Sequence, residues 1–322
     1  CGAEKMRAAA ADAALARAYR PRGQVAAFSP LDIAGLQLWL KADAGLTLST
    51  SGYAGTGTVT QVGTALTGVG TLFLSEVVVG DTISGVNISG NVVSIADNTH
   101  LTLDASNTGA GVAYTITPVA GVSDRVTTWA DQSGQGSHAT QVTADKMPVL
   151  KLAIQNGKPV VRGDSTNDVI AAPLAGASFS AFTIAWALSV PAGATKGVWQ
   201  WASTGAEVAV DPAVLLQRDT TLNVFVNGGY RWTLAHDTAF HTVILTYAAN
   251  VWELFVDGVS QGTYAGGTAN KDIATYIYCN SGYNGYVGGD FGEHLIYNSA
   301  LSAANRGKLE TYLNSAARWA VY

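Results

Sequence analysis

Hydrolysis of a glycosidic bond needs two acidic side chains, one to attack or to activate water and one to donate a proton. No glutamate of this chain has a second glutamate within five positions. Glu253 and Asp257 flank three strand residues at the apparent entry of a hairpin. We interpret them as solvated residues at a strand edge rather than as a catalytic pair. We therefore predict that the protein is not an enzyme. The six glutamates are Glu4, Glu76, Glu207, Glu253, Glu293 and Glu310.

The spacing of the histidines and cysteines predicts neither a metal site nor a disulfide framework. The five histidines show neither a His-x-His nor a His-Glu-x-x-His spacing, so a zinc site is not predicted. The two cysteines, Cys1 and Cys279, make neither a disulfide framework nor a metal cluster. Cys279 lies in an apolar stretch and is predicted to be a buried thiol. Cys1-Gly2 is how a mature lipoprotein begins, but the Ala-rich residues that follow favour an incomplete or unusual start.

Two aromatic loops have the composition of a sugar-binding surface. Carbohydrate recognition commonly uses exposed aromatic faces together with amide hydrogen bonds, placed in loops over a rigid scaffold. The segments 228–232 and 281–286 combine glycine with aromatic and polar side chains. Ordinary packing or a subunit contact is the alternative role. The candidate ligand-binding residues are Tyr230, Trp232, Tyr283, Asn284 and Tyr286.

The composition indicates a turn-rich β-protein with a weakly charged surface. Of the 322 residues, 48% are hydrophobic and 13% are charged, and the net charge is −5. Few cations and a negative charge argue against a nucleic-acid partner, because phosphate binding needs clustered lysines and arginines. No apolar run reaches the roughly 18 residues that span a bilayer.

Short strands are expected to build most of the chain. Alternating apolar and polar residues are punctuated by Gly, Asn and Asp, as in a β-sandwich. Asp257-Gly258 between two apolar runs predicts a hairpin. Helices are expected at Glu4–Arg20, which is Ala-rich and too weakly apolar to fold alone, and after the N-cap candidate Ser302. The expected strands include Leu36–Leu40, Phe182–Leu188, Leu222–Val226, Thr242–Tyr247, Trp252–Val256 and Tyr276–Tyr278.

Residues 55–118 differ in texture from the rest of the chain. They are dense in Thr, Val and Gly and contain no Trp, Lys or Arg. We expect five or six short strands, one of them at Thr71–Leu74, closing as a small barrel. Because Leu46–Ser51 and Val126–Trp129 look like two parts of one sandwich, this unit is predicted to be an insertion. The expected domains are a helical arm at 1–30, a jelly roll at 31–54 plus 119–322, and the insert at 55–118.

Four segments, in order along about 230 residues, resemble the concanavalin A-like lectin/glucanase superfamily, in its laminin-G-like branch. The resemblance implies an all-β, two-sheet jelly-roll sandwich, which with the insert, a short N-terminal helical arm and a C-terminal helix is the expected fold. In the third segment Gly163 replaces the usual aromatic residue and Ser165 the usual glycine. The segments are Leu38–Asp43, Trp129–Ala139, Pro159–Asp168 and Gly289–Tyr297 with the helix after Leu301.

The same resemblance suggests calcium as the one cofactor to consider, since laminin-G-like relatives sometimes bind it. Calcium takes six to eight oxygen ligands, many of them carboxylate. The candidate metal-ligating residues are Asp131, Asp164 and Asp168, with Asn167 close by. The alternative is that these side chains cap their own turns.

The insert resembles small β-modules of bacteriophage tail and other virion proteins, through Gly70–Phe73, Val79–Ile83 and Leu101–Leu103. With the phrase Pro30–Leu40, which is similar to the start of phage jelly rolls, this implies a structural or binding protein on the virion surface: a capsid decoration, head fibre or tail-fibre module. Expected partners are capsid or tail proteins, further copies of the chain, as in a trimer, and glycans. The alternative is a secreted or bacterial surface lectin-like module.

Overall fold

The computed structural model describes residues 28–49, 51–119, 124–164, 167–174, 179–190, 196–202, 214–218, 221–226, 229–235, 237–266, 274–277 and 288–322. The predicted helix Glu4–Arg20 and both cysteines lie outside these residues. In the described part the chain is mostly β-strand, which confirms the all-β fold class. Two short 3₁₀ turns, Pro30–Asp32 and Ala144–Lys146, precede strands.

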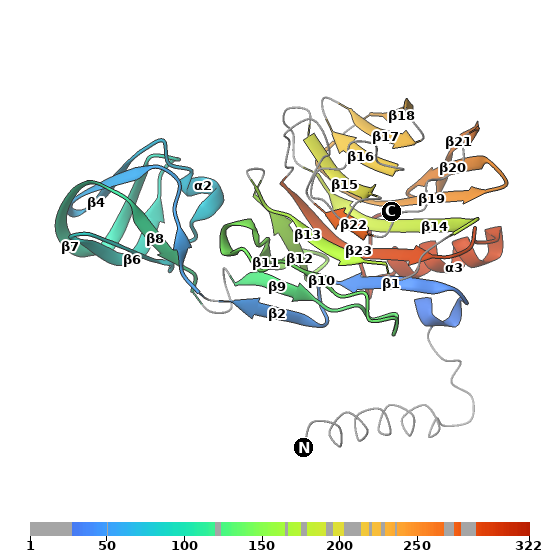
Figure 1. The fold of residues 1–322 in the computed structure, drawn as a ribbon, viewed down its shortest axis with the longest axis horizontal. Helices are drawn as coiled ribbons and strands as arrows, with labels where there is room; N and C mark the ends of the chain where they lie inside the picture. The colour runs from blue at the N-terminus through green and yellow to red at the C-terminus, as the bar shows by residue number, and fades with distance from the viewer. Residues whose placement is uncertain are drawn as a thin grey trace, which may run out of the picture.

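A two-layer sandwich forms the larger part of the molecule (Figure 1). The strands of the first layer, in spatial order, are β21 (Val259–Ala265), β20 (Val251–Val256), β19 (Phe240–Ala248), β14 (Phe182–Ser189) and β23 (Gly289–Tyr297), followed by β1 (Leu36–Lys41) and β12 (Lys158–Gly163), which share the far edge of β23. Those of the second layer are β2 (Leu46–Ser49), β9 (Arg125–Trp129), β10 (Ala139–Thr140), β13 (Ile170–Pro173), β22 (Ala274–Ile277), β15 (Lys196–Ala202), β16 (Val214–Arg218), β17 (Leu222–Val226) and β18 (Gly229–Leu234). Strand β11 (Val149–Gln155) pairs with both β12 and β9 and so joins the layers.

The main core lies between the two layers. Trp129 and Ile170 of the second layer belong to the same buried cluster as Trp186, Leu245 and Phe291 of the first. Along β14, Phe182, Ile184, Trp186 and Leu188 enter this cluster at every second position, as the period of two requires.

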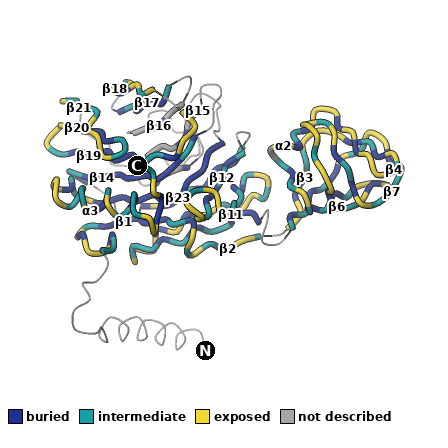
Figure 2. Tube along the Cα trace, turned by 180° about the vertical axis from the view of Figure 1, so that it is seen from behind, coloured by how far each residue is buried: buried dark blue, intermediate teal, exposed yellow. Residues whose placement is uncertain are grey.

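A helix covers the outer face of the first layer. α3 (Ala303–Leu313) begins at Ser302, whose Oγ accepts a hydrogen bond from the Asn305 N–H at 3.3 Å. Leu309 and Leu313 are fully buried and share a cluster with Leu295 of β23. Strands β14 and β23 are thus covered on both faces, which is why Figure 2 shows them buried along nearly their whole length. The predicted C-terminal helix and its N-cap are confirmed. Within the described part of the chain, none of the helices has the length and apolar character needed to span a bilayer.

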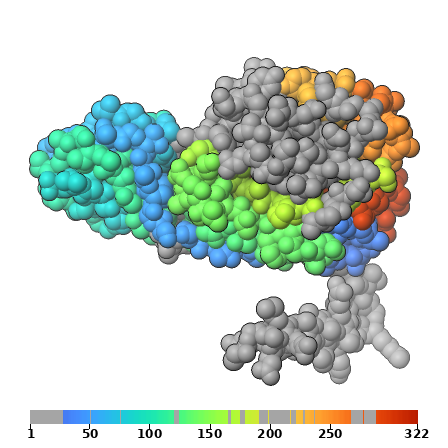
Figure 3. Space-filling view, in the orientation of Figure 1, coloured from blue at the N-terminus to red at the C-terminus, as the bar shows by residue number. Residues whose placement is uncertain are grey.

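The segment inserted after β2 forms a separate sheet with its own core, seen as a lobe beside the sandwich (Figure 3). One short helix, α2 (Phe73–Glu76), stands where the sequence predicted a strand at Thr71–Leu74, and that prediction was wrong. Phe73 is fully buried and packs edge-on against Tyr114 at 6.0 Å, so the turn that carries it into the core overrides local strand propensity. The six strands, in spatial order, are β3 (Tyr53–Ala54), β8 (Tyr114–Thr117), β5 (Thr82–Gly85), β6 (Ile88–Ile95), β7 (His100–Val112) and β4 (Thr58–Val69).

The sandwich strands that precede and follow this lobe in the sequence, β2 and β9, pair directly with each other. In the β2–β9 ladder, Leu46 is opposite Trp129 and Ser49 is opposite Arg125. The chain therefore leaves the sandwich and returns to it at adjacent points of one sheet.

Candidate functional site

The aspartates predicted as metal ligands belong to two different turns. Asp131, in the turn after β9, is nearly buried. Its Oδ1 accepts hydrogen bonds from the N–H groups of Trp39 at 2.9 Å and Ser133 at 2.8 Å. Its Oδ2 accepts from the Ser133 hydroxyl at 2.7 Å and from the Ser137 N–H at 3.2 Å. Both carboxylate oxygens thus hold the turn and tie it to β1.

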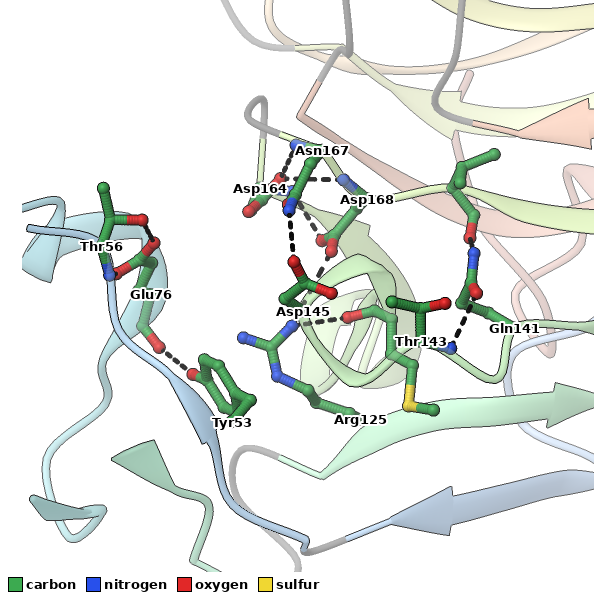
Figure 4. A network of polar contacts seen from close by, with 12 residues as sticks. Tyr53, Thr56, Glu76, Arg125, Gln141, Thr143, Asp145, Asp164, Asn167 and Asp168 are labelled. Carbon is green, nitrogen blue, oxygen red and sulfur yellow. Dashed lines mark hydrogen bonds and ion pairs between the residues drawn. The ribbon is translucent and has the colours of Figure 1, made fainter. Parts of the chain in front are cut away.

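The other two aspartates, Asp164 and Asp168, hydrogen-bond to each other's backbone after β12 (Figure 4). Asp164 Oδ1 accepts from the N–H groups of Asn167 at 3.2 Å and Asp168 at 3.3 Å. Asp168 Oδ2 accepts from the Asp164 N–H at 2.9 Å. Burial, with the nearby Asp164 carboxylate, raises the pKa of Asp168 well above its usual range, and the cation of Arg125 acts in the opposite direction.

These contacts match the turn-capping alternative rather than a calcium site. Among the residues that the structure describes, no group of three or more His, Cys, Asp or Glu side chains is placed to hold a metal ion. Asp131 holds one turn, whereas Asp164 and Asp168 hold another together with Arg125.

Arg125 is a residue at the joint between the two lobes that the sequence did not single out. It is buried between the sandwich and the insert, where it lies 3.7 Å from Asp168 Oδ1 and donates to the Met147 carbonyl at 2.7 Å. Its guanidinium also lies 3.5 Å from the centre of the Tyr53 ring. The Tyr53 hydroxyl in turn donates to the Glu76 carbonyl at 2.5 Å, and burial raises the pKa of Tyr53 to about 12. Figure 4 shows this chain of contacts, which joins the two lobes.

A polar cavity lies where β12, β14 and β23 run side by side. It has a volume of about 390 Å³. The register places Gly163 opposite Gly289 and Ser189 opposite Asp290, so the three strands bring these residues to one place. The described residues that line the cavity are Arg162, Gly163, Ser189, Thr238, Gly288, Gly289 and Asp290.

An arginine–carboxylate pair forms one side of this cavity. Arg162 donates from Nε to Asp290 Oδ1 at 2.6 Å and from Nη2 to Asp290 Oδ2 at 2.8 Å. The Asp290 side chain is 12% exposed and that of Arg162 is 41% exposed, so the pair is held rigidly but stays in reach of a ligand. The Ser189 hydroxyl donates to the Thr238 carbonyl at 2.9 Å, on the same wall. Three glycines leave the backbone bare, so a polar ligand can approach amide groups closely.

The predicted ligand-binding residues are only partly visible. Tyr230 is 50% exposed and packs edge-on against Phe225 at 5.5 Å. Trp232 lies in strand β18, where it faces the core, and its indole N–H donates to the Gln261 carbonyl at 3.2 Å, so its ring is not an exposed platform. Tyr283, Asn284 and Tyr286 lie outside the described residues, in a segment that directly precedes Gly288 in the sequence.

The acidic residues considered for catalysis, Glu253 and Asp257, accept hydrogen bonds within and beside the β20–β21 hairpin. Glu253 Oε1 accepts from the Ser260 hydroxyl at 3.0 Å, and Asp257 Oδ1 accepts from the Thr242 N–H at 2.8 Å. Gly258–Gly262 also contains the spacing Gly-x-Ser-x-Gly, which is typical of a serine nucleophile. A serine nucleophile on that motif needs a strand-to-helix turn and a basic partner, whereas Ser260 lies on strand β21 and donates to a glutamate.

Comparisons with known proteins give a fold but no family. No family model matches the chain, and no curated protein matches it. Among solved structures, a mutant of a GH54 α-L-arabinofuranosidase is 12% identical, with a TM-score of 0.50, over 82% of this chain and 62% of that chain. The ligand-binding domain of botulinum neurotoxin serotype D is 11% identical, with a TM-score of 0.45, over 57% of this chain and 48% of that chain. The binding domain of Paraclostridial Mosquitocidal Protein 1 is 12% identical, with a TM-score of 0.46, over 58% of this chain and 50% of that chain.

The chain spans about half the length of the two toxin domains it matches. The likeness to the arabinofuranosidase supports the β-sandwich expected from the sequence.

Proposed function

We propose that this chain is a non-catalytic carbohydrate-binding protein with a laminin-G-like jelly roll, and that the cavity beside Arg162 and Asp290 holds the sugar. The observation that carries the proposal is the bidentate pair on a rigid sheet, open to a cavity of about 390 Å³. Planar charged groups beside bare backbone are suited to the paired hydroxyls of a sugar ring.

Binding is favoured over cleavage by the number of carboxylates. Among the described residues that line the cavity, Asp290 is the one carboxylate, and it already accepts two charged hydrogen bonds. Glycosidases commonly need two carboxyl groups facing each other across the scissile bond. The structurally similar arabinofuranosidase was soaked with an arabinofuranoside, so a fold of this kind is compatible with a sugar ligand.

A glycan array followed by titration of the best ligand tests the site. Arg162→Lys keeps the positive charge but loses the two-pronged geometry, so we expect affinity to fall about tenfold or more. Arg306→Lys is the matched control, since Arg306 pairs with Glu310 on α3 at 3.3 Å and does not line the cavity. Equal affinities of the two variants for the best glycan would contradict a sugar site here. An array on which no glycan binds the protein would contradict it as well. Release of reducing sugar that disappears in Asp290→Asn contradicts the non-catalytic assignment.

We further propose that the protein is a component of a bacteriophage virion, on its outer surface, with capsid or tail proteins and further copies of itself as partners. Support comes from the sequence, through the phage-like opening phrase and the Thr/Gly/Val-rich insert. Mass spectrometry of purified particles from the source culture, together with neighbouring genes for capsid, portal or tail proteins, tests this assignment. Detection of the chain only in the secreted or cell-surface fraction would favour the lectin-like alternative.

A further inference from the structure

The outer side of α3 carries an apolar groove that the sandwich does not fill. The groove has a volume of about 790 Å³. Leu309 and Leu313 face the sheet, whereas the opposite side of the helix is exposed and rich in small side chains. Described residues along the groove include Phe28, Ala304, Gly307 and Thr311, together with the cations Lys308 and Arg318.

The position of Phe28 indicates what fills this groove. Phe28 is the first described residue, lines the groove itself, and packs edge-on against Tyr312 of α3 with ring centres 6.1 Å apart. The described chain therefore begins at the groove wall, with 27 residues before it in the sequence. Seven of them, 21–27, can span at most about 25 Å, which exceeds the roughly 16 Å length of α3.

The composition of the preceding segment matches the groove. Glu4–Arg20 is Ala-rich, a strong helix former, yet its apolar side consists mainly of alanine with Leu15 and Tyr19. Such a helix is marginal in isolation and gains stability by packing. Alanines on one helix and Ala304, Gly307 and Thr311 on the other allow two helix axes to approach closely.

We propose that residues 4–20 of the same chain dock as a helix in the groove beside α3. Attachment at Phe28 favours the same chain over a second copy, because a short tether gives a high effective concentration. Docking would cover the apolar groove and fix the N-terminal segment against the outer face of the first layer.

Hydrogen exchange on the full-length chain tests the proposal, with Thr311→Arg placing a bulky side chain across the groove. Exchange of the amides of residues 4–20 should be about tenfold or more faster in this variant than in the unaltered protein. Ala303→Arg is the matched control, because Ala303 is exposed on the same helix but does not line the groove, and it should exchange like the unaltered protein. Leu15→Asp should reproduce the effect from the other side.

Several outcomes would overturn the proposal. Equal exchange of residues 4–20 in the unaltered protein and in Thr311→Arg means that the groove does not hold the segment. Protection that falls on dilution, with a dimer in sedimentation, assigns the groove to a second copy instead. If Thr311→Arg loses its near-ultraviolet circular dichroism, and so is misfolded, Ala304→Arg at another exposed position of the groove replaces it. Exchange of residues 4–20 at the same rate in Ala304→Arg and in the unaltered protein also overturns the proposal.

Discussion

His241 of β19 lies between two carboxylates, an arrangement that makes one residue sensitive to pH. Its Nδ1 is 2.6 Å from Asp257 Oδ2 and its Nε2 is 2.9 Å from Asp237 Oδ1. The hydrogen bond to Asp257, followed by that to Asp237, raises the pKa of His241 to about 9 against the loss of solvation. The imidazolium is therefore the form that the folded protein favours at neutral pH.

We expect His241→Gln to lower the free energy of unfolding at pH 6 but not at pH 10. A histidine whose folded pKa lies above its unfolded value near 6.5 contributes its full stability below pH 6.5 and loses it as the pH rises through about 9. The difference at pH 6 should be about 1 kcal/mol, the usual size for a partly exposed pair. Urea denaturation at both pH values measures it. The same difference at pH 6 and pH 10 would show that the charge is not responsible.

At the scale of single residues, the sequence identified the turns better than the partners of their side chains. Asp131 and Asp164 were considered first as metal ligands, and the alternative role of turn capping follows from a short-range property of Asp. Arg125 was not singled out, because its contacts with Tyr53 and Asp168 come from distant parts of the chain. The pairing of Arg162 with Asp290 likewise spans 128 positions and appears only when β12 and β23 lie side by side.

Strands and helices followed the sequence wherever a local rule decided them. The Asp257-Gly258 hairpin is confirmed, since both residues have the positive φ that this turn requires, 48° and 76°. Strand β17 coincides with the prediction, Leu222–Val226. The wrong strand at Thr71–Leu74 failed because burial of Phe73, a tertiary effect, decided the local conformation.

The N-cap of α3 is a local rule whose energy can be measured. Ser302→Ala removes the acceptor for the Asn305 N–H and should lower the free energy of unfolding by about 1 kcal/mol. Ser302→Asp keeps a good cap and should leave stability nearly unchanged. Chemical denaturation of the three proteins decides between them. A loss of the same size in both variants would mean that the hydroxyl packs rather than caps.

At the scale of the whole molecule, the sequence predicts an insertion but gives no sign of the joint between the lobes. The change in composition at residues 55–118 and the strand-like flanks both lie in the sequence. The joint depends on Tyr53 and Arg125, which the sequence separates by the whole insert. The cavity beside Arg162 was equally hidden, because it arises from the register of three strands.

The pairing of β2 with β9 predicts that the sandwich folds without the insert. Ser49 and Arg125 are direct partners in the ladder, so the two strands can be joined by a short hairpin loop. We expect a chain in which Asn-Gly replaces residues 51–123 to unfold in one cooperative transition, at a Tm a few degrees lower than the full chain. The lower Tm follows from the loss of the Tyr53 ring over the Arg125 guanidinium, a contact worth about 0.5–2 kcal/mol. Tyr53→Ala in the full chain is the matched control and should shift the sandwich transition by a similar amount. Calorimetry of the three proteins measures these transitions. The expectation fails if the shortened chain aggregates or lacks near-ultraviolet circular dichroism while Tyr53→Ala stays folded. The sandwich would then depend on the insert for more than this one contact.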